Sequence, residues 1–212
     1  MESTVDQHVQ AITTRFEALS SLRDRALADG RQIIRISANS VRAIHRGELT
    51  DARAQLAEAE SLLHALADSL RGHGAIYWAG YVQDAMKEFA EARVTLAIVS
   101  RGLIPSPGEL GIEDAAYLNA LAEAASELRR LVLDTLRGDD IALAEHFLRQ
   151  MDEIYSVLIG VDFPDAVTGG LRRTTDQLRA VLERTRGDVT LTLNQRRLER
   201  VLRGAEYQGP DV

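Results

Sequence analysis

The sequence of 212 residues contains no cysteine and almost no lysine. Without cysteine there are no disulfides, no thiolate nucleophiles and no cysteine-ligated zinc or iron–sulfur sites, which fits a reducing cytoplasm. Of the 25 basic residues only Lys87 is a lysine, and the others are arginine, which suits planar contacts with carboxylate and phosphate groups. The 32 acidic residues give a net charge of −7, which argues against a general nucleic-acid coat protein.

Long apolar runs are also missing. No stretch of about 18 apolar residues occurs, and the N-terminus has no basic stretch followed by an apolar run. We therefore expect a soluble, cytoplasmic protein that does not contact a membrane. Strand signals are nearly absent, since only the short segment 188–193 alternates. An apolar content of 45% supports a sizeable core, and the length predicts one domain over residues 1–212 with a frayed tail at about 204–212.

Several catalytic and binding motifs do not occur. The chain has no G-x-S-x-G motif, no Walker A loop and no dinucleotide-binding fingerprint. None of its five histidines lies three residues after a glutamate, so the Glu-x-x-His pattern of ferritin-like di-metal proteins is absent. These absences argue against the enzyme classes that depend on such motifs.

Helical periodicity is what the sequence does have. Apolar residues recur at spacings of three and four between glycine- and proline-containing breaks, which predicts seven helices in an all-α bundle. The expected ranges are about 5–47, 50–71, 76–101, 113–136, 141–160, 171–186 and 190–203, with a loop at 102–111. The long N-terminal helix would measure about 60 Å, more than a compact domain of this size, so we expect part of it to pack against another subunit.

Two of the predicted helices carry closely spaced carboxylates. Asp84, Glu88 and Glu91 share one face of the third helix, and Glu123 and Glu127 lie one turn apart on the fourth. Like charges at these spacings repel, but a divalent cation would reverse the penalty, and Mg²⁺ and Mn²⁺ prefer oxygen ligands. Small and apolar neighbours would let the two helices approach closely. The alternative is that these are ordinary surface glutamates.

A stripe of arginines runs along the first helix. Its members fall within about 60° of arc, and they are Arg31, Arg35, Arg42 and Arg46. Such a stripe could follow a phosphate backbone, or it could be a solvated face that pairs with acids on neighbouring helices.

An aromatic cluster begins the third helix, where Tyr77 and Tyr81 lie one turn apart and Trp78 lies between them. These rings could stack on single-stranded bases. The alternative is that they are core residues or contacts between subunits.

Four segments resemble, in order, the translin superfamily. The segment 30–48, GRQIIRISANSVRAIHRGE, resembles the signature of its first helix, and 110–130, LGIEDAAYLNALAEAASELRR, resembles its Tyr-Leu…Glu-Leu helix. The segments 144–158, AEHFLRQMDEIYSVL, and 182–191, LERTRGDVTL, fit as well. The resemblance extends from about Ala26 to Arg200. It implies a seven-helix bundle that assembles into a hollow octamer.

The superfamily has two main branches, translin itself, which binds single-stranded nucleic acid, and translin-associated factor X (Trax), which contributes the catalytic carboxylates of a ribonuclease. The segment EFAEA is similar to the Trax pattern Glu-Tyr-Val-Glu-Ala, which places Glu88 and Glu91 on its two acids. The Trax Asp-x-x-x-Glu pair falls on Glu123 and Glu127, with glutamate replacing the aspartate, while Asp84 is outside the usual set. The basic, histidine-rich segment of translin is replaced by YWAGYVQD. The chain thus resembles a prokaryote-type, archaeal-type Trax-like protein.

This resemblance implies a metal-dependent endoribonuclease that acts on single-stranded or small structured RNA. Glu88, Glu91, Glu123 and Glu127 would be the catalytic residues and would hold Mg²⁺ or Mn²⁺, which activates water to leave a 5′-phosphate and a 3′-hydroxyl. No histidine is expected to take part. The arginine stripe and Lys87 would hold the RNA backbone, in a homo-oligomer expected to be an octamer.

Two other hypotheses remain open from the sequence. One is a non-catalytic oligomer of translin type that binds single-stranded RNA or DNA. The other is a purely structural helical assembly whose glutamates are solvated.

Overall fold

A computed structural model describes residues 3–206, with side chains up to residue 203, and shows only helices in this range. The long helices are α1 (Thr4–His45), α2 (Leu49–Ser69), α4 (Gly80–Val99), α6 (Asp114–Arg137), α7 (Ile141–Leu158) and α9 (Leu171–Glu206). Single-turn helices are α3 (Gly74–Tyr77), α5 (Pro107–Leu110) and α8 (Asp165–Thr168). The predicted all-α class with a long first helix is confirmed. Most of the predicted frayed tail, residues 207–212, lies outside the described residues.

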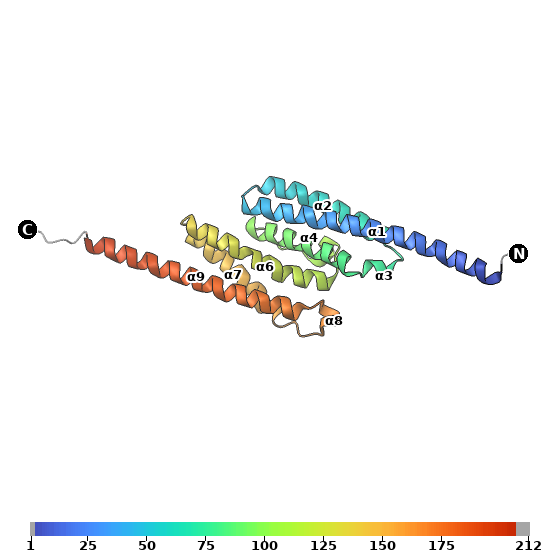
Figure 1. The fold of residues 1–212 in the computed structure, drawn as a ribbon. Helices are drawn as coiled ribbons and strands as arrows, with labels where there is room; N and C mark the ends of the chain where they lie inside the picture. The colour runs from blue at the N-terminus through green and yellow to red at the C-terminus, as the bar shows by residue number, and fades with distance from the viewer. Residues whose placement is uncertain (1–2, 207–212) are drawn as a thin grey trace, which may run out of the picture.

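The helices form layers around a central pair (Figure 1). α1 and α2 pack together on one side, α4 and α6 lie in the middle, and α7 and α9 lie on the other side. One apolar cluster is formed by α1, α2 and α4 with the start of α6, and a second by α6, α7 and α9 with the end of α4. The central pair therefore contributes to both clusters and is held from both sides.

α4 and α6 run in the same direction because the segment 100–113 returns the chain to the start of the bundle. The Tyr77 hydroxyl, just before α4, donates a hydrogen bond of 2.6 Å to Glu113, just before α6. Further along, Lys87 of α4 contacts Glu123 of α6. Several alanines of the two helices are fully buried, and these are Ala85, Ala90, Ala92, Ala120, Ala122, Ala124 and Ala125. Such short side chains permit a close packing of helices.

The first half of α1 extends beyond the bundle (Figure 1). Ser3 begins the helix with a capping box to Asp6, and Gly47 follows its end with a φ of 78°, as expected for a C-cap glycine. The predicted apolar stripe starts on the protruding half, where its residues are 40–66% exposed, namely Val5, Val9, Ile12, Phe16 and Leu19. Leu22 is the first residue of this helix that packs against the core, and Ala26 is the first that is fully buried in it. The protruding half thus presents an apolar surface to solvent.

The prediction of two C-terminal helices, 171–186 and 190–203, is wrong, because both ranges belong to a single helix, α9. The break was expected at Gly187, since glycine in a helix costs about 1 kcal/mol relative to alanine. Tertiary contacts offset that cost. Val189 is buried in the second apolar cluster, and Asp188 forms a 2.8 Å ion pair with Arg129 of α6.

The third predicted helix, 76–101, is instead divided into α3 and α4. Ala79 interrupts it with an extended backbone, at a ψ of 142°. The side-chain amide of Gln83 donates a hydrogen bond of 3.0 Å to the backbone carbonyl of Tyr77 across this break. The interruption places Tyr77 and Trp78 before α4, whereas Tyr81 and the carboxylates lie on α4 itself. None of the helices in the described part of the chain is long and apolar enough to cross a membrane.

Candidate active site

Carboxylates of α4 and α6 gather between these two helices. Glu88 and Glu91 of α4 and Glu123 of α6 each offer an oxygen atom, and these atoms lie within 4.8 Å of one another. The parallel course of the helices keeps the two acidic pairs level. Because carboxylate oxygens are the ligands that Mg²⁺ and Mn²⁺ prefer, this donor set fits either ion. The structure thus brings three of the four predicted ligands into one cluster, and Asp84 is outside it.

Glu91 is the most perturbed member of this cluster. Its pKa is raised to about 8. The largest cause is burial, and the neighbouring carboxylates of Glu88, Glu123 and Glu127 add to it. Burial also raises the pKa of Glu88, although Lys87 opposes this shift. Without an added positive charge, Glu91 is therefore protonated at neutral pH. A divalent cation would favour its ionised form.

Lys87 lies inside the cluster and not beside the arginine stripe. Its Nζ is 2.8 Å from a carboxylate oxygen of Glu123 and 3.6 Å from Glu88. Burial lowers the pKa of Lys87, but the hydrogen bond that Lys87 donates to Glu123 and the nearby acidic charges outweigh this effect and raise the pKa overall. Lys87 is therefore charged, and it neutralises part of the carboxylate cluster.

Glu127, the fourth predicted ligand, contacts a histidine. His45, the last residue of α1, places Nε2 at 2.9 Å from Glu127 Oε2, and its side chain is only 2% exposed. Because a carboxylate can only accept, Nε2 donates this bond, which holds the pKa of Glu127 below its ordinary value. Among the described residues, the buried Nδ1 atom of His45 has no hydrogen-bond partner.

The sequence analysis expected no histidine at the site, and it therefore missed the contact between His45 and Glu127. The available signal was periodicity: His45 follows Val41 by four residues and buried Ser37 by eight, which places it on the inward face of α1.

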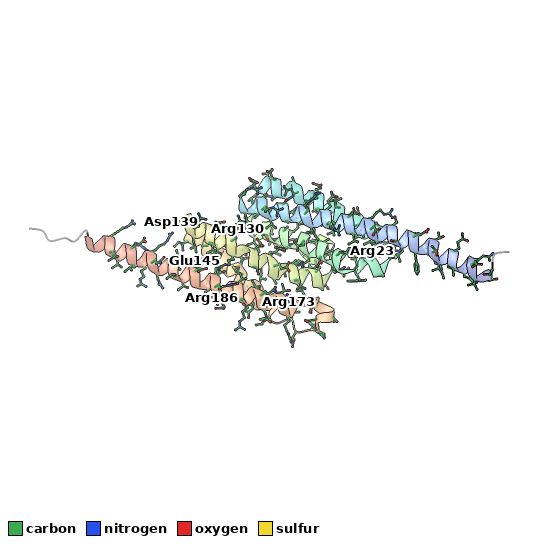
Figure 2. The ribbon with its side chains drawn as sticks, in the orientation of Figure 1. Arg23, Arg130, Asp139, Glu145, Arg173 and Arg186 are labelled. Atoms are coloured by element: carbon green, nitrogen blue, oxygen red, sulfur yellow. The ribbon has the colours of Figure 1, made fainter. Side chains whose placement is uncertain are left out.

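A cavity of about 380 Å³ opens beside Glu88, Glu91 and Glu127. Its other walls come from α1 and α6 and include Ser37, Arg42, His45 and Arg130. The Ser37 hydroxyl is buried without a hydrogen-bond partner in the described residues. Arg130, one turn after Glu127 on α6, was not predicted (Figure 2). Two guanidinium groups beside a hydroxyl form a suitable environment for a phosphate group.

The predicted arginine stripe is exposed along its whole length, but only part of it lies at this site. Arg42 lines the cavity. Arg46 instead forms a hydrogen bond of 2.9 Å with Glu48, and Arg31 and Arg35 lie further back along α1.

The aromatic cluster is divided between two roles. Tyr77 and Tyr81 are partly buried and pack against the first apolar cluster, as the core interpretation predicted. Trp78 is 60% exposed. The cluster therefore does not act as one unit, and only its tryptophan presents a ring to solvent.

Most of the chain is similar to known proteins. No family model matches it. It is similar to the uncharacterized protein MJ0175 of Methanocaldococcus jannaschii, at 31% identity over 188 residues, which cover 86% of this chain and 82% of the relative.

Solved structures give closer information on the fold. The chain is similar to AfC3PO, both in a crystal structure of that protein and in its complex with duplex RNA, with a TM-score of 0.82 and 31% identity over 89% of this chain and 98% of AfC3PO. It shares the fold of apo-NeC3PO at a TM-score of 0.77 and 18% identity, over 91% of this chain and 98% of that one. Together with the helical architecture, these similarities show that the chain belongs to the translin superfamily, the family of the C3PO proteins.

Proposed function

We propose that this protein is a metal-dependent endoribonuclease that cleaves single-stranded or small structured RNA. The observation that carries the proposal is the cluster of Glu88, Glu91 and Glu123, whose oxygens lie within 4.8 Å of one another and in which the partly buried Glu91 has a pKa of about 8. Such an arrangement is unfavourable without a cation and is typical of functional sites. That AfC3PO binds duplex RNA supports RNA as the polymer.

The residues of the site have separate roles in this proposal. Glu88, Glu91 and Glu123 hold Mg²⁺ or Mn²⁺, and Glu127, kept ionised and oriented by His45, completes the ligand set. The ion, when bound, polarises phosphate oxygens and makes water a better nucleophile at neutral pH. Arg42 and Arg130 hold the phosphate group in the adjoining cavity.

The test is the cleavage of end-labelled single-stranded RNA in Mg²⁺ or Mn²⁺, with EDTA as the control. We expect products with a 5′-phosphate and a 3′-hydroxyl, and no cleavage in EDTA. Replacement of both cavity arginines, Arg42→Gln with Arg130→Gln, should raise KM for RNA. The matched control is Arg149→Gln, which removes an exposed arginine from α7. Cleavage that persists in EDTA would contradict the proposal.

A second candidate is a non-catalytic oligomer that binds single-stranded RNA or DNA. The ion pair of Lys87 with Glu123 favours it, because the ammonium group already neutralises carboxylates without a metal ion. RNA binding with no cleavage in either metal would support this candidate. A purely structural assembly would bind no nucleic acid at any salt concentration.

We also propose that the protein is a homo-oligomer, an octamer, in which the exposed half of α1 contacts another copy. Its apolar side chains are 40–66% exposed, which marks an interaction surface. Light scattering should give about 187 kDa, eight times the chain mass of 23.4 kDa. Val9→Glu with Phe16→Glu should lower this mass without loss of helicity, whereas Gln10→Glu with Thr13→Glu, on exposed positions of the same segment, should not.

A further inference from the structure

A second cavity of about 390 Å³ adjoins the carboxylate cluster, since Lys87 and Glu123 line it. It lies between α4, α6, the α8 turn and the start of α9, and its walls include Trp78, Lys87, Ala116, Asn119, Glu123 and Val167. The two cavities meet at the cluster, because Glu88 lines the first, Glu123 lines the second, and their oxygens lie within 4.8 Å. A polymer bound at the cluster would therefore reach both cavities.

Trp78 forms one wall and is fixed in place although it is 60% exposed. Its indole meets the Tyr77 ring edge-on, with centroids 5.2 Å apart and an interplanar angle of 87°. The Tyr77 hydroxyl is in turn anchored to Glu113 at 2.6 Å. A large aromatic ring held rigidly in an accessible position suits stacking on a flat ligand.

Another part of the cavity wall is also formed in advance. It carries Val167, which is 65% exposed, on the α8 turn. Asn119 of α6 ties this turn down, since its amide donates hydrogen bonds of 2.8 Å to the carbonyls of Ala115 and Thr168. Thr174 of α9 donates to the Asn119 carbonyl oxygen at 2.6 Å. The cavity thus has apolar and aromatic walls that do not depend on a ligand.

The charges of this cavity argue against a phosphate group inside it. Asp84 and Glu123 both line it, and Lys87, its basic residue, is already paired with Glu123. The arginines lie in the first cavity instead. The two cavities therefore suit different parts of a nucleotide, with the phosphate beside the arginines and the flat, neutral base beside the tryptophan.

We propose that the Trp78 cavity binds one unpaired nucleobase of the RNA strand, next to the phosphodiester at the carboxylate cluster, by stacking on the indole. This inference rests on the proposed function, and it deepens it by defining the substrate. A base inserted between Trp78 and Val167 must leave its own stack, so the enzyme selects nucleotides that are single-stranded or displaced from a duplex.

The chain offers a direct reporter, because Trp78 is its only tryptophan. The full-length Glu91→Gln protein in Mg²⁺ is titrated with a short single-stranded RNA, because this variant should leave the RNA uncleaved. Wild-type protein in EDTA is titrated in the same way as a second measurement. We expect quenching of the tryptophan fluorescence and protection from acrylamide. A blunt duplex of the same sequence should produce little of either effect.

Variants and modified RNA locate the contact. Trp78→Ala should weaken binding roughly 5- to 150-fold, the range typical for loss of one stacked base, and Trp78→Phe should restore most of it. Leu103→Ala removes another exposed apolar side chain and should have no effect. An RNA made abasic at one nucleotide in turn should show the same loss at a single position, and Trp78→Ala should add nothing to the loss at that position.

The outcomes separate this inference from the proposed hydrolysis. If RNA is cleaved but Trp78→Ala binds and cleaves it normally, the base cavity is wrong and the nuclease proposal stands. If quenching and the abasic effect occur without cleavage in any metal, the cavity stands and the nuclease proposal is wrong. If RNA leaves the fluorescence unchanged while Trp78→Ala lowers the oligomer mass, Trp78 is a subunit contact and the inference is overturned.

Discussion

The carboxylates of α6 and those of α4 differ in what surrounds them. Glu123 and Glu127 of α6 each have a basic partner, Lys87 at 2.8 Å and His45 at 2.9 Å. Glu91 of α4 is partly buried among other carboxylates, and its pKa rises to about 8. The protein thus pairs both carboxylates of α6 with basic groups and places Lys87 near Glu88, whereas Glu91 has no ion pair within the described residues. The difference identifies Glu91 as the position where an added cation changes the energy of the site most.

The largest effect is expected when this uncompensated carboxylate is removed. Glu91→Gln should lower kcat/KM for RNA cleavage by more than about 100-fold, because loss of a residue that merely supports a ligand already costs about 10- to 100-fold. The same change should make the metal-free protein more stable, since a crowded buried carboxyl group becomes a neutral amide. Cleavage assays and thermal unfolding in EDTA measure the two effects.

The matched control for this change is Glu58→Gln, at an exposed position of α2, which should alter neither quantity. If Glu91→Gln cleaved RNA as well as wild type does, the contrast between α4 and α6 would have no catalytic meaning.

A smaller loss is expected when α6 loses a partner. His45→Ala removes the hydrogen bond that orients Glu127, so metal affinity and cleavage should each fall by about 10- to 100-fold. His45→Gln keeps an N–H donor and should recover part of the loss. His146→Ala, which removes another histidine, on α7, is the control for general damage to packing. Equal losses in His45→Ala and His146→Ala would indicate destabilisation alone.

The contrast should also appear as a pH dependence. The pKa of Glu91 is raised from 4.5 to about 8, so its contribution to the stability of the metal-free protein is complete below about pH 4.5 and is lost as the pH rises to about 8. Metal binding has the opposite trend, because Glu91 must release its proton. Mn²⁺ affinity measured by calorimetry should rise by up to about tenfold per pH unit between 6 and 8 and then level off. A flat profile over this range would show that Glu91 is already ionised.

The smallest effect is expected at Lys87, which competes with a metal ion for Glu123. Lys87→Met should tighten Mg²⁺ binding about threefold to tenfold above pH 8, where the carboxylates are ionised, and Lys87→Arg should not. Weaker Mg²⁺ binding in Lys87→Met would instead mean that the ammonium group holds Glu123 in position for the ion.

Sequence reasoning succeeded where the evidence was local and failed where it was distant. The 3.6-residue periodicity predicts the long helices, because each helix must bury one face. Gly187 misled the assignment of α9, because its local cost is visible in the sequence and the burial of Val189 is not.

For the site, spacing placed each acidic pair on one face of its own helix. The small neighbours of the acids allowed the two pairs to meet, and the family resemblance strengthened that hypothesis. His45 lies 82 residues from Glu127 and Arg130 has no motif of its own, so their positions depend on how α1 crosses the central pair.

The returning segment 100–113 has a consequence for how this protein tolerates insertions. The register between α4 and α6 is set by contacts such as those of Tyr77 with Glu113 and Lys87 with Glu123, and not by the length of the connection. Residues added beside Leu103, which is 96% exposed in this connection, should therefore leave the acids in place relative to one another. A single residue inserted between Glu88 and Glu91 would turn the later carboxylate by about 100° around α4 and away from its partners. An intact site thus tolerates a change of length in the connection, but it does not tolerate one within α4.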